Sequence, residues 1–130
     1  MAMADRALPA KTVLVVDDED TVRLVTARAL EHMGFSVLTA TDGLTGVQLF
    51  ERHADDVACI LLDMTMPHLS GEEAFARIVQ IRSEARVVLM TGHSEADARE
   101  AFQGRGLAGF VQKPFDLQTL QSAVFAAIDR

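Results

Sequence analysis

The chain has 130 residues, which is enough for one domain and too few for two. Its 19 acidic residues outnumber its 12 basic ones, and the basic residues are scattered, which makes direct binding of nucleic acid unfavourable. No apolar run approaches the ~20 residues of a membrane span, and the first eleven residues contain no signal-peptide core. We therefore expect no membrane insertion, and we interpret residues 1–11 as a mobile tail before a domain at 12–130.

The chain contains one cysteine, Cys59, within the apolar run at residues 58–62. A lone cysteine cannot form an internal disulfide, and in such a run it is expected to be a buried, reduced thiol. This composition suits a cytoplasmic protein.

Short apolar runs alternate with segments of helical spacing. Strands are expected at residues 13–16, 37–38, 58–62, 87–90 and 110–111, several of them continuous, as in sheets covered on both faces. Helices are expected between and after them, with apolar stripes of Val22, Val25, Ala29 and Met33; Leu44, Val47 and Phe50; Phe75, Ile78 and Val79; and Leu117, Leu120, Val124 and Ile128. The segment at 95–103 has the least apolar bulk and is expected to be the loosest helix.

Helix boundaries support this division. Residues 70–73 fit a capping box, and three further N-caps are expected at Asp42, Ser94 and Asp116. Gly34 fits a helix stop. A strand followed by a helix, five times over, predicts an α/β fold with a parallel sheet between two helical layers and right-handed crossovers.

Ligands of such sheets bind beyond the carboxyl ends of the strands. At these positions the sequence has Asp17 and Asp18 after the first strand, Asp63 after the third, Thr91 after the fourth and Lys113 after the fifth. Three neighbouring carboxylates repel one another unless a cation is present, and an all-oxygen acidic cluster suits Mg²⁺. The ion and an ammonium group can neutralise a phosphoryl group, while one carboxylate serves as the nucleophile.

Four motifs follow the expected strands in order. They are Val15-Val16-Asp17-Asp18-Glu19, Leu61 to Pro67 with Gly71 four residues on, Met90-Thr91-Gly92, and Phe110 to Phe115. Together they resemble the signatures of response-regulator receiver domains, from about Thr12 to the C-terminus. The resemblance implies a doubly wound, flavodoxin-like sandwich of five strand–helix units with strand order 2-1-3-4-5.

The resemblance also implies roles for individual residues. Asp63 would be the phosphoacceptor, and Lys113, before a cis Pro114, would pair with the phosphoryl group. Thr91 would move to contact phosphate and Phe110 would swing inward, coupling the site to the face of the fourth helix, fifth strand and fifth helix. Asp18, Asp63 and the Thr65 backbone carbonyl would ligate Mg²⁺ directly, with Asp17 acting through water.

As partners, the resemblance implies a sensor histidine kinase or a histidine phosphotransfer protein, with homodimerisation on phosphorylation as an option. The domain would catalyse only its own phosphorylation and dephosphorylation and would not be an enzyme in the usual sense. A receiver excised from a hybrid sensor kinase stays open. Two other hypotheses are a degenerate receiver that acts only as an interaction module, and a small phosphatase or flavin-binding α/β domain.

Overall fold

A computed structural model describes residues 11–64, 66, 68–92, 95–102 and 106–129. The elements in chain order are β1 (Thr12–Val16), α2 (Asp20–His32), β2 (Ser36–Ala40), α3 (Gly43–His53), β3 (Val57–Asp63), α4 (Gly71–Ile81), β4 (Val87–Thr91), α5 (Glu95–Phe102), β5 (Gly109–Gln112) and α6 (Leu117–Ile128). Most of the expected tail, residues 1–10, lies outside the described residues. No helix in the described part of the chain is long and apolar enough to cross a membrane.

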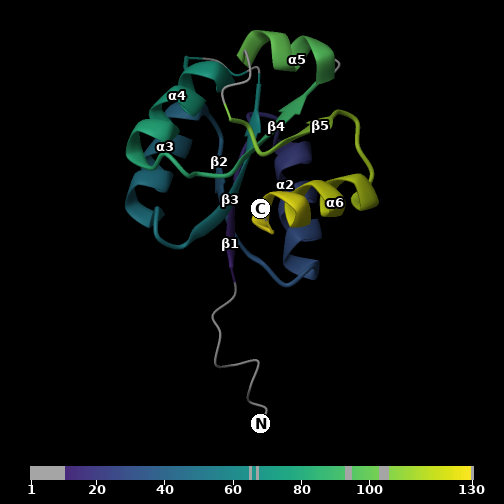
Figure 1. The fold of residues 1–130 in the computed structure, drawn as a ribbon. Helices are drawn as coiled ribbons and strands as arrows, with labels where there is room; N and C mark the ends of the chain where they lie inside the picture. Colours follow the sequence, from purple (N-terminus) through teal and green to yellow (C-terminus); the bar gives the residue numbers. More distant parts are fainter. Residues whose placement is uncertain (1–10, 65, 67, 93–94, 103–105, 130) are drawn as a thin grey trace.

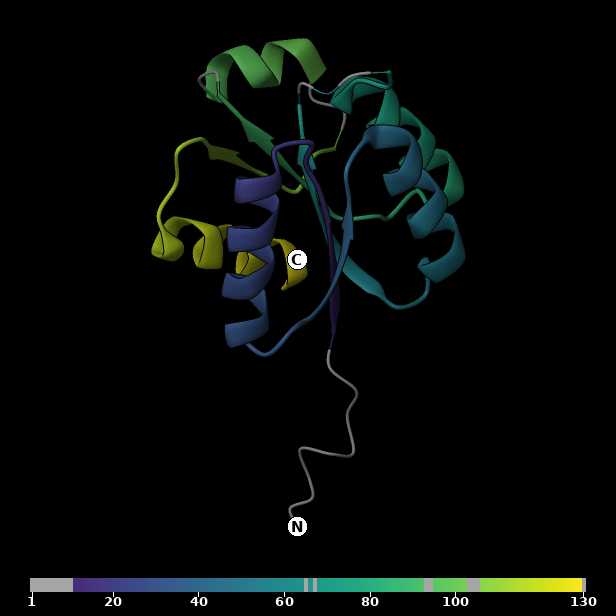
Figure 2. The same cartoon turned by 180° about the vertical axis from the view of Figure 1, so that it is seen from behind.

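The five strands form one parallel sheet in the order β2-β1-β3-β4-β5. Helices α3 and α4 lie on one side of this sheet, and α2 and α6 lie on the other (Figures 1 and 2). This arrangement confirms the doubly wound, flavodoxin-like α/β sandwich and the strand order that the sequence predicted. Because all five strands run in the same direction, their carboxyl ends meet at a single edge.

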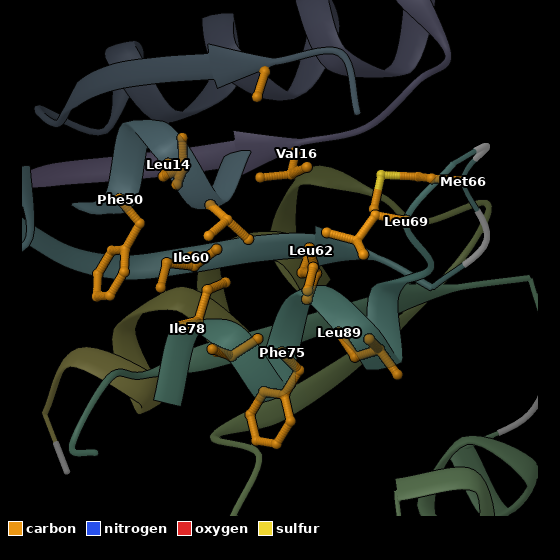
Figure 3. Packing of buried hydrophobic residues seen from close by; sticks show 14 of the residues in the cluster. Leu14, Val16, Phe50, Ile60, Leu62, Met66, Leu69, Phe75, Ile78 and Leu89 are labelled. Atoms are coloured by element: carbon orange, nitrogen blue, oxygen red, sulfur yellow. The ribbon is translucent and has the colours of Figure 1, made fainter. Parts of the chain in front are cut away.

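Side chains alternate between the two faces of the sheet, and both faces are buried. On β1, Leu14 and Val16 belong to the cluster under α3 and α4, while Val13 and Val15 belong to the cluster under α2 and α6. Cys59 lies in the second cluster and is fully buried, as predicted. Figure 3 shows the first cluster, in which the labelled side chains include Leu14, Val16, Phe50, Ile60, Leu62, Phe75, Ile78 and Leu89.

The predicted helix ends are largely confirmed. The Ser70 hydroxyl accepts from Glu73 N at 3.1 Å and the Glu73 carboxylate accepts from Ser70 N at 3.0 Å, which completes the capping box of α4. Asp42 caps α3 and Asp116 caps α6, through Thr45 N at 2.8 Å and Thr119 N at 2.7 Å respectively. Gly34 ends the turn after α2 with a φ of 98°, a conformation that favours glycine. The expected cap Ser94 lies outside the described residues.

The apolar stripes were predicted less accurately than the helices themselves. Val25 is 62% exposed, Leu117 57% and Leu44 46%, although each was assigned to a buried stripe. On α2 the buried residues are Thr26 and Leu30, four positions apart on one face. Ala29 and Met33 of the predicted stripe do pack against the core, whereas Val25 does not, and a count of apolar residues leaves out the buried Thr26.

Candidate functional site

The backbone brings the predicted site residues to one edge of the sheet. Asp17 follows β1, and its N–H donates to Ala40 O at the end of β2 over 3.1 Å. Asp63 is the last residue of β3, and Thr91 is the last residue of β4. Lys113 follows β5, and its N–H donates to Thr91 O over 2.7 Å. Residues up to 96 positions apart in the sequence therefore share one pocket because their strands end together.

Three carboxylates meet in this pocket. Oxygen atoms of Asp17, Asp18 and Asp63 all lie within 4.8 Å of one another. Asp17 and Asp63 are buried, whereas Asp18 is exposed. Asp17 is held firmly, since its Oδ1 accepts from Glu19 N at 2.9 Å and its backbone oxygen accepts from the Arg23 guanidinium at 2.9 Å. The first strand thus ends in one fixed, buried carboxylate and one that faces solvent.

Lys113 is the cation of the pocket. Its Nζ lies 2.8 Å from Asp17 Oδ2, 3.3 Å from Asp63 Oδ1 and 3.3 Å from Glu19 Oε1. The expectation that Lys113 shares a pocket with the acidic residues is confirmed. Its contact with Glu19 was not predicted, because nothing in the local sequence indicates which acidic side chain reaches a lysine 94 residues away.

Burial and neighbouring charges act in opposite directions on the pKa values of Asp63 and Lys113. Burial, with the negative charges of Asp17 and Asp18, raises the pKa of Asp63 to about 7, and Lys113 opposes that rise. Burial alone would lower the pKa of Lys113. The hydrogen bond to Asp17 and the charges of Asp63 and Asp17 outweigh burial, so that this pKa lies above its ordinary value. One ammonium group therefore does not fully compensate the carboxylates around it.

These residues fit a hard divalent cation. The three converging side chains offer only oxygen atoms, and the raised pKa of Asp63 shows that further positive charge would be favourable there. The fourth ligand that the resemblance implied, the backbone carbonyl of Thr65, lies outside the described residues. The donor set is therefore consistent with Mg²⁺.

Thr91 and Phe110, the expected switch residues, lie on neighbouring strands. Thr91 is 1% exposed, and its hydroxyl lies 3.5 Å from the sulfur of Met64. Phe110 pairs with Leu89 across β4 and β5 and packs, half-buried, against the cluster under α3 and α4. Thr91 and Phe110 therefore lie on hydrogen-bonded neighbouring strands, β4 and β5.

Gly71 allows the loop after β3 to return tightly over the end of that strand. Its N–H donates to Met64 O at 3.0 Å. A Cβ atom at this position would lie 2.5 Å from Asp63 O and 2.8 Å from Met64 Cα, closer than packed atoms allow. The absence of a side chain at Gly71 therefore contributes to the placement of Asp63.

A groove of about 570 Å³ opens beside the pocket. One wall comes from α2, with Val22 and Val25, and the other from Pro114 and Phe115. Lys113 also lines it, so the groove leads directly to the acidic cluster. The Lys113–Pro114 peptide bond is cis, as the resemblance implied.

Comparison with known proteins identifies the class. The sequence profile of the family described as "Response regulator receiver domain" matches residues 13–125, and the chain belongs to this family. It is thus a receiver domain of a two-component system. The solved response regulator receiver domain protein of Clostridium thermocellum is similar, with a TM-score of 0.86 and 32% identity, covering 92% of this chain and 95% of that one.

Two curated relatives differ in how much of their own length this chain spans. Sporulation initiation phosphotransferase F of Bacillus subtilis is 29% identical over 86% of this chain and 89% of its own length. Sensor kinase CckA of Brucella abortus is 27% identical over 92% of this chain, which spans only 13% of that kinase. The chain spans 25 to 60% of three curated regulatory proteins that it also matches.

Proposed function

We propose that this receiver domain accepts a phosphoryl group on Asp63 from the phosphohistidine of a kinase or phosphotransfer protein. The observation that carries the proposal is the pocket itself, in which buried Asp63 lies 3.3 Å from the Lys113 amine among oxygen-only side chains. A carboxylate oxygen of Asp63 would form the new P–O bond as the P–N bond of the donor breaks and the histidine nitrogen leaves with the bonding pair.

Asp63 is a better nucleophile candidate than its acidic neighbours. Asp17 is fully buried and already engaged by Lys113 and by the backbone N–H of Glu19. Asp18 is exposed and is not paired with Lys113 among the described contacts. Asp63 combines burial with a small exposed fraction of 8% and a nearby cation. These features suit a nucleophile that the donor can reach and that has a cation beside it to stabilise the charge of the phosphoryl group.

Asp18 and Asp63 would ligate Mg²⁺ directly, with the Thr65 carbonyl that the resemblance implies, and Asp17 would act through water. When bound, the ion would neutralise charge on the phosphoryl oxygens and favour the ionised, nucleophilic form of Asp63. That second effect matters because a carboxyl group with a pKa of about 7 is substantially protonated at neutral pH.

The proposal includes a switch. The Thr91 hydroxyl would contact the phosphoryl group, and Phe110 would turn further inward beside it. Support comes from their places on adjacent strands and from the bond between Lys113 N and Thr91 O. The face of α5, β5 and α6 would then change, and a homodimer formed through it would be detected by sedimentation of the phosphorylated protein.

The donor is proposed to dock in the groove beside Lys113. Its walls are apolar, Val25 is 62% exposed, and an occupant would be held next to Asp63. Apolar area of this kind suits the hydrophobic face of a helix. The unpaired thiol of buried Cys59 supports a cytoplasmic setting, where such donors act. The domain would act in this exchange as a substrate that assists its own phosphorylation.

The test is phosphorylation by acetyl phosphate with Mg²⁺, followed by intact-mass spectrometry. One phosphoryl group should add to the wild-type protein and none to Asp63→Asn. Addition that persists in that variant would overturn the assignment. Failure of the wild-type protein to bind Mg²⁺ at millimolar concentration would favour a module that acts only by interaction.

A second variant separates docking from chemistry. Val25→Glu places a charge in the groove at an exposed position, so the fold should be retained. Transfer from phosphorylated histidine kinases of the same organism should slow by at least about tenfold, the effect of ~1.4 kcal/mol. Phosphorylation by acetyl phosphate should stay unchanged. Equal slowing with both donors would contradict docking in the groove.

A further inference from the structure

The Lys113 amine has as many carboxylate partners as it has hydrogens to donate. An ammonium group carries three N–H donors. Its nitrogen lies 2.8 Å from Asp17 Oδ2, 3.3 Å from Asp63 Oδ1 and 3.3 Å from Glu19 Oε1. A phosphoryl oxygen that arrives at this amine would therefore have to replace one of the three carboxylates.

The three partners differ in how easily they can leave. The side chain of Asp17 is 0% exposed and that of Asp63 is 8% exposed, whereas that of Glu19 is 63% exposed. Release of Asp17 or Asp63 would leave a buried charge without its cation, which is strongly unfavourable. Water can solvate a released Glu19 carboxylate at little cost. Glu19 is therefore the partner that the amine gives up most readily.

Glu19 is also positioned for this contact rather than for a structural task. It occupies the N-cap position of α2, yet its side chain makes no capping hydrogen bond. Its backbone N–H donates to Asp17 Oδ1 at 2.9 Å, which fixes the start of the side chain beside the pocket. Its carboxylate is not among the three that face one another at the candidate cation site. The side chain thus serves Lys113 and neither the helix nor the ion.

We propose that Glu19 is a positioning residue that occupies the third donor of the Lys113 amine until a phosphoryl oxygen takes its place. The inference rests on the proposed function. It adds a role for Glu19, a residue of the first motif to which the resemblance assigned none. Glu19 keeps the amine aimed at the pocket before phosphorylation and competes with the phosphoryl group for it. Removing the contact should make binding of a phosphoryl group easier, because one competitor is lost.

The first experiment measures binding of beryllium fluoride, a mimic of the phosphoryl group, in the presence of Mg²⁺ by isothermal titration. Glu19→Gln should bind it about two- to fivefold more tightly than wild type, the range that an exposed ion pair supports. Glu19→Asp keeps the charge but is one methylene shorter, and it should behave like Glu19→Gln. The matched control is Asp20→Asn, which removes a neighbouring charge that pairs with Arg23 and not with Lys113.

These variants separate a contact from a general charge effect. Tighter binding in both Glu19 variants, with wild-type binding in Asp20→Asn, supports the inference. An equal shift in Asp20→Asn and Glu19→Gln, with none in Glu19→Asp, would assign the effect to net charge and overturn it. Unchanged binding in both Glu19 variants would overturn it as well.

The second experiment needs neither metal nor phosphate. The chain has two lysines, Lys11 and Lys113, and exposed Lys11 provides an internal reference. Acetylation by an uncharged reagent in EDTA, followed by mass spectrometry, should modify Lys113 at least twofold faster relative to Lys11 in both Glu19 variants. An unchanged ratio would show that Glu19 does not hold the amine. If the ratio rises but wild type binds no beryllium fluoride, the contact stands and the phosphoryl role of the pocket is wrong.

Discussion

Both ends of the sheet carry ion pairs, but two of those at the carboxyl end are buried, whereas those of Arg82 at the amino end are exposed. At the carboxyl end, Lys113 meets Asp17 and Asp63, and all three side chains are at most 15% exposed. At the other end, Arg82 lies 3.3 Å from Asp55 and 3.0 Å from Glu84, which are 101% and 73% exposed.

The comparison shows that burial decides what an ion pair does. Around Arg82, water screens the charges, and the pairs contribute little to stability or to reactivity. Around Lys113, desolvation and the neighbouring carboxylates Asp17 and Asp18 raise the pKa of Asp63 to about 7, and one ammonium group does not balance the carboxylates around it. Charged pairs are therefore simply solvated at one end of the sheet, whereas at the other end they form a candidate binding site.

The largest expected effect comes from removing the buried cation. Lys113→Met should lower the free energy of unfolding by about 3 kcal/mol at pH 7 in EDTA, because two buried carboxylates lose their partner. Urea denaturation followed by circular dichroism measures it. A loss below ~1 kcal/mol, the range of a surface pair, would remove the distinction between the two ends.

A smaller effect is expected from pH. The folded pKa of Asp63, about 7, lies above its ordinary value of 3.8, so between these values the folded state holds a proton that the unfolded state releases. Stability in EDTA should therefore fall as pH rises from 4 to 7. The full shift corresponds to ~3 kcal/mol over this range, and solvent screening of the partly buried group reduces the expected fall to about 2 kcal/mol. Asp63→Asn should lack that part of the fall, and Mg²⁺ should reduce it in wild type. Parallel curves for the two proteins would contradict the raised pKa.

The smallest effect is expected at the exposed end. Arg82→Met should lower the free energy of unfolding by less than about 1 kcal/mol, since both carboxylates stay hydrated when the guanidinium is removed. Most of the change should reflect the lost bond from Arg82 to Ala54 O, at 2.8 Å. The same denaturation assay applies, with added salt leaving the difference nearly unchanged. A loss equal to that of Lys113→Met would contradict the role given to burial.

The sequence predicted the parallel α/β class and most of the pocket because both depend on the order of elements along the chain. Continuous apolar runs mark strands, and parallel strands with their turns bring Asp17, Asp63, Thr91 and Lys113 to one edge whatever the details of packing. The strand order and the assignment of roles came from the resemblance, since periodicity does not specify which strands are neighbours.

Two features lay beyond the sequence for physical reasons. The exposure of Val25 depends on which face of α2 meets the sheet, and the presence of Thr26 on that face is a matter of packing rather than polarity. The pairing of Glu19 with Lys113 depends on side-chain reach across the pocket. The run of four acidic residues at 17–20 was the only signal, and it does not indicate which of them faces the cation.

The two walls of the groove beside the pocket come from segments that are translated early and late in synthesis. Val22 and Val25 belong to the second element of the chain, whereas Pro114 and Phe115 follow the last strand. A ribosome would therefore display Asp63 well before either Lys113 or the second wall has been translated. An unfinished chain therefore lacks one wall of the groove in which the donor is proposed to dock.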